Sequence, residues 1–153
     1  MRRQIMEIKK SWNQFKKDAK KEGLEFLNGC CYMTAKQISL GTATIYLCTS
    51  RSYEDEIQWY CKEINKIKIN KYGGWTADRQ ERGINCCNEK IAFYEGEKQK
   101  YGTRENEAKV KASTIVNSKA FKTFCEASGL NVTTAIETKI EYGVERYWLR
   151  IKY

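Results

Sequence analysis

Two groups of basic residues carry the clearest chemical signal in this chain of 153 residues. One lies at alternate positions near the carboxyl end, where three cations surround a large ring: Arg146, Trp148, Arg150 and Lys152. The other lies within the first 22 residues and comprises Arg2, Arg3, Lys9, Lys10, Lys16, Lys17, Lys20 and Lys21. Clustered cations bind phosphates, and an exposed ring among them stacks on an unpaired base. Both groups therefore predict a surface for nucleic acid.

Each group also has an explanation that needs no ligand. Lysines on a helix commonly form a solvated face, although eight like charges on one face cost self-repulsion when no partner neutralises them. The two arginines near the carboxyl end can pair across a hairpin with Glu137 and Glu141, while the ring packs on their stems. A basic amphipathic helix can also lie on a membrane surface. The apolar stripe of this helix is narrow and continues into a folded chain, which favours packing in a core.

Catalytic and metal-binding patterns are weak. The chain has zero His, which removes Cys/His and Ser/His nucleophile pairs and most zinc sites. Two adjacent cysteine pairs, Cys30-Cys31 and Cys86-Cys87, are poorly placed for one ion, because neighbouring side chains diverge on a strand and on a helix. Acids such as Glu54 and Asp55 fit the first turn of a helix. We therefore predict a protein that is not an enzyme, with no catalytic residue, no metal ligand and no cofactor.

Composition indicates a globular protein of the cytoplasm. Hydrophobic residues make up 41% of the chain and charged residues 31%, which is typical of a chain that folds alone. No run of about 18 uncharged apolar residues is present, and the amino end lacks the apolar segment of a secretory signal. Seven cysteines cannot all pair, so reduced thiols are expected.

The charge is unevenly placed. The formal net charge is +9. Residues 1–22 hold eight Lys or Arg against three acids, residues 104–153 hold nine against six, and the segments between are nearly balanced. The two ends of the chain are therefore the basic parts.

Apolar periodicity predicts the elements that position these residues. Steps of three and four in Ile5, Ile8, Trp12, Phe15 and Ala19 predict a helix over 3–22 that ends at Gly23. Strands are predicted over 30–40 and 42–49, and helices over about 52–70, 84–101, 103–116 and 118–128. Strict alternation on both sides of Gly143 predicts a terminal hairpin over 131–153.

This order predicts a single α+β domain over residues 1–153. Its antiparallel sheet is built from two hairpins (about 30–49 and 131–153) and is covered by four or five helices. We predict a small non-enzymatic binding protein whose basic surface engages nucleic acid or a nucleoprotein complex. The alternative is an inhibitor or adaptor that docks on an acidic protein surface, in the manner of phage or mobile-element antagonists of a host nucleic-acid-handling defence complex. The sequence sets neither the choice among DNA, RNA and protein nor the oligomeric state.

Overall fold

The computed structural model describes residues 2–24, 34–39, 41–129 and 131–153. Over these ranges the chain has five helices and a four-stranded antiparallel sheet made of two hairpins, which confirms the predicted α+β class. The chain forms two compact units: one comprises residues 1–50 and 107–153, and the other comprises residues 51–106. That the two units form a single domain over residues 1–153 stays a prediction.

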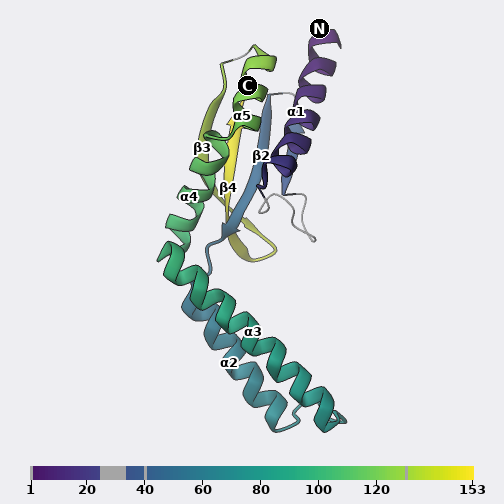
Figure 1. Ribbon diagram of the computed structural model, residues 1–153, viewed down its shortest axis with the longest axis vertical. Helices are drawn as coiled ribbons and strands as arrows, with labels where there is room; N and C mark the ends of the chain where they lie inside the picture. Colours follow the sequence, from purple (N-terminus) through teal and green to yellow (C-terminus); the bar gives the residue numbers. More distant parts are fainter. Residues whose placement is uncertain (1, 25–33, 40, 130) are drawn as a thin grey trace. The chain divides into compact units, whose positions relative to one another are not determined.

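The sheet belongs to the first unit (Figure 1). Its strands are β1 (Ala35–Ser39), β2 (Thr42–Thr49), β3 (Thr133–Glu141) and β4 (Val144–Lys152), in the order β1-β2-β4-β3. The two hairpins therefore join through the long central pair β2 and β4, and β1 and β3 are the edge strands. Of the first predicted strand, residues 30–33 and 40 lie outside the described residues.

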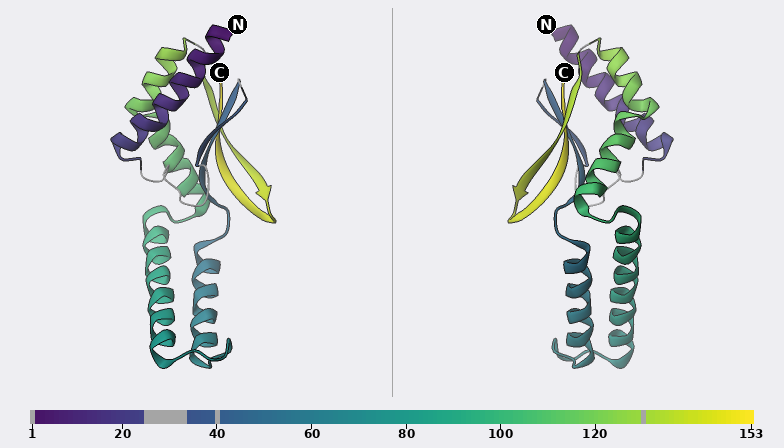
Figure 2. Two further views of the ribbon diagram at one scale, coloured as in Figure 1. Left: turned by 90° about the vertical axis from the view of Figure 1, so that its right-hand side faces the viewer. Right: turned by 90° about the vertical axis from the view of Figure 1, so that its left-hand side faces the viewer.

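Three helices cover one face of this sheet: α1 (Arg2–Glu22), α4 (Arg104–Val116) and α5 (Lys119–Ser128) (Figure 2). The core between them is aromatic. The Trp12 ring lies 5.1 Å from Phe15 and 5.6 Å from Phe124 between centroids, and Phe15 lies 6.1 Å from Phe121. Burial of each such side chain stabilises the fold by roughly 1.5–3 kcal/mol. The apolar stripe predicted for residues 3–22 therefore packs in a core.

Local signals end α1 where the sequence predicts. Gly23 has a φ of 89°, which a residue with a side chain rarely adopts. The Leu24 N–H donates to the Ala19 carbonyl at 3.1 Å, and the Leu24 side chain is buried. This is the pattern of a helix closed by a left-handed glycine and a following apolar contact.

One residue of β2 departs from regular side-chain alternation. Alternation places Cys48 on the face opposite Leu47, but both side chains are buried in the same core cluster. The pairing of β2 with β4 shifts register between Tyr46 and Cys48, so an extra residue is accommodated there. A bulge of this kind reverses the side-chain alternation beyond it.

The second unit consists of two antiparallel helices, α2 (Tyr53–Lys68) and α3 (Ala77–Tyr101). Both begin at a side-chain cap: the Ser52 hydroxyl accepts from the Asp55 N–H at 3.1 Å, and the Thr76 hydroxyl accepts from the Arg79 N–H at 3.2 Å. Along the seam the rings of Tyr60 and Tyr94 stack. The unit is therefore a helical hairpin joined by a narrow line of contacts.

Two glycines inside α3 are expected to respond differently to alanine. A Cβ at Gly96 would meet nothing within 4 Å, so Gly96→Ala should raise the free energy of unfolding by about 1 kcal/mol through helix propensity. A Cβ at Gly83 would lie 3.1 Å from the Trp75 ring and 3.2 Å from Ile67, so Gly83→Ala should lose that gain to crowding. Urea unfolding followed by circular dichroism measures both, and equal stabilisation of the two variants would contradict the close packing at Gly83.

Candidate functional site

Six lysines lie on the solvent side of α1. Their side chains are exposed except that of Lys16, which is half-buried, and they are Lys9, Lys10, Lys16, Lys17, Lys20 and Lys21. The opposite side of the helix carries the buried Trp12, Phe15 and Ala19. Arg2 and Arg3 belong to the helix, and the structure describes their backbone but not their side chains. Six of the eight basic residues predicted for this helix therefore lie together on its solvent side.

Helical spacing arranges these lysines in two rows. Positions 9, 16 and 20 form one row, and positions 10, 17 and 21 form the other, with the rows about 100° apart around the axis. Each row extends about 16 Å along the helix, from the rise of 1.5 Å per residue. This length gives several neighbouring phosphates of a nucleic acid backbone a cation each. We call these six lysines the α1 basic face.

Two of the acids on α1 accept hydrogen bonds from groups outside the α1 basic face. Asp18 accepts a hydrogen bond from Gln14 at 2.9 Å, and Glu22 accepts from the Lys119 backbone N–H at 2.8 Å. In the described parts of the chain, no carboxylate lies within 4 Å of an ammonium group of the α1 basic face. The positive charge of this face is therefore not neutralised by a local ion pair there.

Charge is divided unequally between the two units. The first unit holds 17 Lys or Arg against 9 acids, a net charge of +8. The second unit holds 11 against 10, a net charge of +1. Lys119 and Lys122, exposed on α5, belong to the same charged unit and were not singled out from the sequence. These two lysines could be recognised only from the position of α5 beside α1, which the sequence alone does not show.

The terminal hairpin does not present the expected aromatic ring. Trp148 is 2% exposed and Arg146 is 8% exposed. The Trp148 ring lies 5.3 Å from Tyr46 between centroids, and the Lys36 ammonium lies 4.9 Å above it. Because β4 is a central strand, neighbours from both sides cover this ring. The prediction that Trp148 is available to stack on a base was therefore wrong.

The hairpin arginines are paired with the glutamates that the alternative interpretation named. Arg146 lies 3.4 Å from Glu141, and Arg150 lies 2.6 Å from Glu137. Lys152, at the end of the strand, is exposed. Most of the positive charge of this group is therefore compensated across β3 and β4.

The two basic groups lie on opposite faces of the sheet. Leu149 and Ile151 face the core together with Trp12 of α1. Side chains alternate along a strand, so the even-numbered residues of β4, Arg150 among them, point to the other face. Figure 2 shows α1, α4 and α5 on one side of the sheet only. The basic helix and the basic hairpin therefore do not form one surface.

Burial affects two of the described cysteines. None of the described cysteines takes part in a disulfide, and these are Cys48, Cys61, Cys86, Cys87 and Cys125. Burial raises the pKa of the Cys87 and Cys125 thiols above the ordinary value, which lowers their nucleophilicity at neutral pH. Cys86 is exposed while Cys87 is buried, so this adjacent pair diverges as expected. Cys30 and Cys31 lie outside the described residues.

No metal-binding group of three or more Cys, Asp or Glu side chains occurs in the part of the chain that the structure describes. Likewise, none of the described helices is both long enough and apolar enough to cross a membrane.

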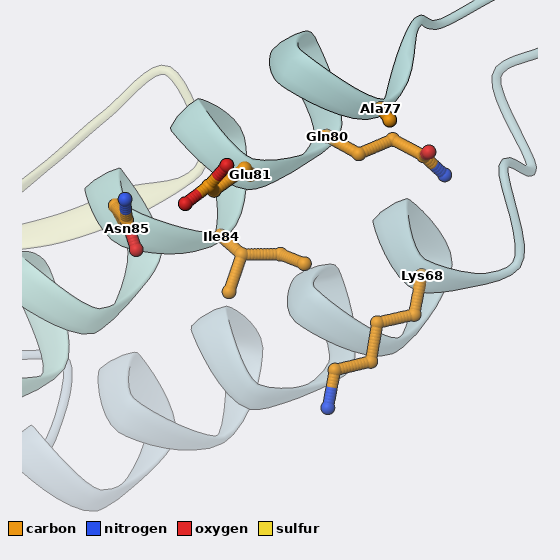
Figure 3. Close-up of a pocket in the computed structure, with 6 residues that line it drawn as sticks. All are labelled: Lys68, Ala77, Gln80, Glu81, Ile84 and Asn85. Carbon is orange, nitrogen blue, oxygen red and sulfur yellow. The ribbon is translucent and has the colours of Figure 1, made fainter.

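Each unit contains a cavity of about 320 Å³. The first lies between α2 and α3, where Lys68 comes from α2 and Gln80, Glu81, Ile84 and other residues come from α3 (Figure 3). The Gln80 amide there donates to the Ile67 carbonyl at 2.8 Å. The second lies between α1 and α5, with Phe15 and Phe124 among its lining residues and Lys10 of the α1 basic face beside them.

Comparisons of the chain with protein-family models, with curated proteins and with solved structures found no significant match. The charge and packing of the described residues are therefore what supports a functional proposal.

Proposed function

We propose that the protein is a small, non-enzymatic binding protein of the cytoplasm whose α1 basic face engages nucleic acid or a nucleoprotein complex. The observation that carries this proposal is the pair of lysine rows on α1, which no described carboxylate neutralises. Like charges held on one rigid helix repel each other, and a polyanion removes that repulsion. Free thiols at the described cysteines suit the reducing interior of a cell.

The mechanism of binding is electrostatic. Each phosphate that a lysine neutralises releases condensed counterions, so affinity falls as salt rises. Six lysines in contact with duplex DNA predict a slope of about −5 for the logarithm of the binding constant against the logarithm of salt concentration, and about −4 for a single strand. The paired arginines and the buried ring of the hairpin add little to this slope. We therefore expect binding with weak base preference.

Removal of one lysine row tests the proposal. Lys9→Gln, Lys16→Gln and Lys20→Gln together should reduce the magnitude of the salt slope on duplex DNA by about 3 and weaken binding at every sequence tested. Fluorescence anisotropy with labelled duplex DNA, single-stranded DNA and RNA, titrated at several salt concentrations, measures both effects.

A matched control removes the same number of charges from the second unit. Lys62, Lys71 and Lys90 are exposed there, and their replacement by Gln changes the net charge of the chain equally. The control should keep most of the slope. No binding of any of the three nucleic acids at low salt would exclude direct recognition, and equal losses in the two triple variants would exclude the α1 basic face as the contact.

A protein-binding inhibitor or adaptor is the second candidate. It is favoured by exposed rings on the nearly neutral second unit, where Trp59 and Phe93 are 48% and 56% exposed. These two rings continue the stacked pair Tyr60 and Tyr94, so four aromatic side chains lie together. Exposed aromatic clusters are typical of protein interfaces. Retention of a protein partner in a pull-down, with loss of that partner in Trp59→Ala and in Phe93→Ala and no affinity for nucleic acid, would support this candidate.

A further inference from the structure

Strand β3 is a long edge strand with exposed apolar side chains. It pairs with β4 on one side, and no strand in the described part of the chain pairs with its other side. Ile136 and Ile140 are 39% and 76% exposed, although they lie on the face that the helices cover elsewhere. Natural proteins usually protect an edge of this length and composition.

The hydrogen-bond pattern shows which backbone groups face outward. The Glu145 carbonyl accepts from the Ser50 N–H, and the Tyr153 N–H donates to the Gly41 carbonyl, so odd-numbered residues of β4 bond toward β2. Even-numbered residues of β4 therefore bond toward β3, where their register partners are odd-numbered. The N–H and C=O groups of the even-numbered residues of β3 consequently point to the free edge, and these are Thr134, Ile136, Thr138 and Ile140.

We propose that a second copy of this chain adds to this edge, antiparallel, with Thr138 of one copy opposite Thr138 of the other. Both residues then exchange outward-facing backbone groups, as an antiparallel ladder requires. Ile136 of each copy lies opposite Ile140 of the other, and Glu137 of each copy lies opposite Lys139 of the other. The side chains of a strand pair are closest at positions without hydrogen bonds, which here are the two Glu–Lys pairs.

The sequence of β3 favours this register over its neighbours. Moving the two-fold axis to Glu137 or to Lys139 places a like charge on the axis opposite itself. Moving it to Ile136 places Glu137 opposite Ala135 and loses both charge pairs. Moving it to Ile140 shortens the ladder, because the strands then meet the turn at Tyr142 and Gly143. Thr138 is thus the axis that combines charge complementarity, apolar pairing and length.

The resulting dimer is closed. Antiparallel addition of identical edges gives a two-fold axis perpendicular to the sheet, so the helices of both copies lie on the same side of an eight-stranded sheet. Both β3 edges are used in the contact. The remaining edge, β1, has five residues and an irregular register, which suits it poorly to further addition. This inference does not depend on the ligand of the α1 basic face.

Charge reversal at Lys139 tests the contact. Sedimentation equilibrium of the full chain should show a dimer that dissociates on dilution. Lys139→Glu should weaken it at least about tenfold, because two attractive pairs become repulsive. Lys152→Glu is the matched control: Lys152 is exposed on the neighbouring strand and carries the same charge, but lies outside the proposed ladder. The control should dimerise as the natural chain does.

Backbone exchange gives a second, register-specific readout. Hydrogen exchange followed by nuclear magnetic resonance should show protection of the Thr138 amide that increases with protein concentration and is reduced in Lys139→Glu. Thr138→Pro removes this outward N–H without removing a bond to β4, so it should yield a folded monomer. Circular dichroism verifies the fold of each variant.

Two results would overturn the proposal. One is a chain that stays monomeric at all concentrations up to about 1 mM, the weak end of specific association. The other is a dimer that Lys139→Glu and Thr138→Pro leave intact while both variants are folded, because the contact then lies elsewhere.

Discussion

Replacement of Trp148 by alanine is expected to lower the free energy of unfolding by about 3–5 kcal/mol, the range found for large aromatic side chains in a core. The ring is 2% exposed, packs edge to face on Tyr46 and lies beneath the Lys36 ammonium. Its removal exposes the apolar surface of the central pair of strands that the ring covers. Urea unfolding followed by circular dichroism measures the loss.

The same variant is expected to keep its affinity for nucleic acid. A buried indole cannot stack on a base, so binding measured well below the unfolding temperature of Trp148→Ala should match that of the natural chain. Trp59→Ala is the control for the loss of an exposed ring, and it should cost less than about 1 kcal/mol. A stable Trp148→Ala protein with lost affinity would contradict the buried position of the ring and restore the sequence prediction.

A milder substitution refines this expectation. The indole N–H of Trp148 is buried with no hydrogen-bond partner among the described residues. An unpaired buried donor costs about 1–3 kcal/mol, so Trp148→Phe removes that cost together with some packing. Trp148→Phe should therefore lower the free energy of unfolding less than Trp148→Ala does. The difference between the two variants should exceed the difference expected from the volume of the ring alone.

The helices and their ends could be predicted because their signals are local. The stripe of Trp12, Phe15 and Ala19 defines one face of α1 from spacing alone. Gly23 ends the helix because its own backbone conformation requires a residue without a side chain. Such signals lie within one or two turns of chain and need no tertiary structure.

The environment of the terminal hairpin could not be predicted in the same way. Alternation assigns Trp148 and Ile140 to opposite faces, and it suggests that the ring is exposed and the isoleucine is buried. The structure shows the reverse, because β4 is central and β3 is an edge strand. Strand order depends on the pairing of β2 with β4, which lie about a hundred residues apart in the chain. No local pattern encodes that pairing.

In the candidate site, too, some features follow from local sequence and others depend on tertiary contacts. Lysine spacing on α1 predicted the α1 basic face, because a helix wheel requires only the sequence. Whether a cation is already neutralised depends on contacts across strands, as Arg150 with Glu137 shows. The sequence offered pairing and ligand binding as alternatives for the hairpin, and the structure shows the pairing of Arg146 with Glu141 and of Arg150 with Glu137.

Loss of the Lys111 ammonium is the second large effect that we expect. Glu107 and Lys111 have the spacing of an ordinary surface pair on a helix. In the structure, however, Glu107 is 2% exposed and its carboxylate lies 2.8 Å from the Lys111 ammonium, which also donates to the Leu47 carbonyl at 3.3 Å. Lys111→Met removes the cation and leaves a buried carboxylate, which should cost about 3–5 kcal/mol.

A double substitution separates the cost of burying an unpaired charge from the value of the pair itself. Glu107→Leu with Lys111→Met removes both charges, and apolar replacement of a buried pair is often neutral or stabilising. The double variant should therefore recover most of the stability that Lys111→Met loses. Lys109→Met, at an exposed position of the same helix, should change stability by less than about 1 kcal/mol. If Lys111→Met were as mild as Lys109→Met in urea unfolding, water would have to reach Glu107 and the carboxylate would not belong to the core.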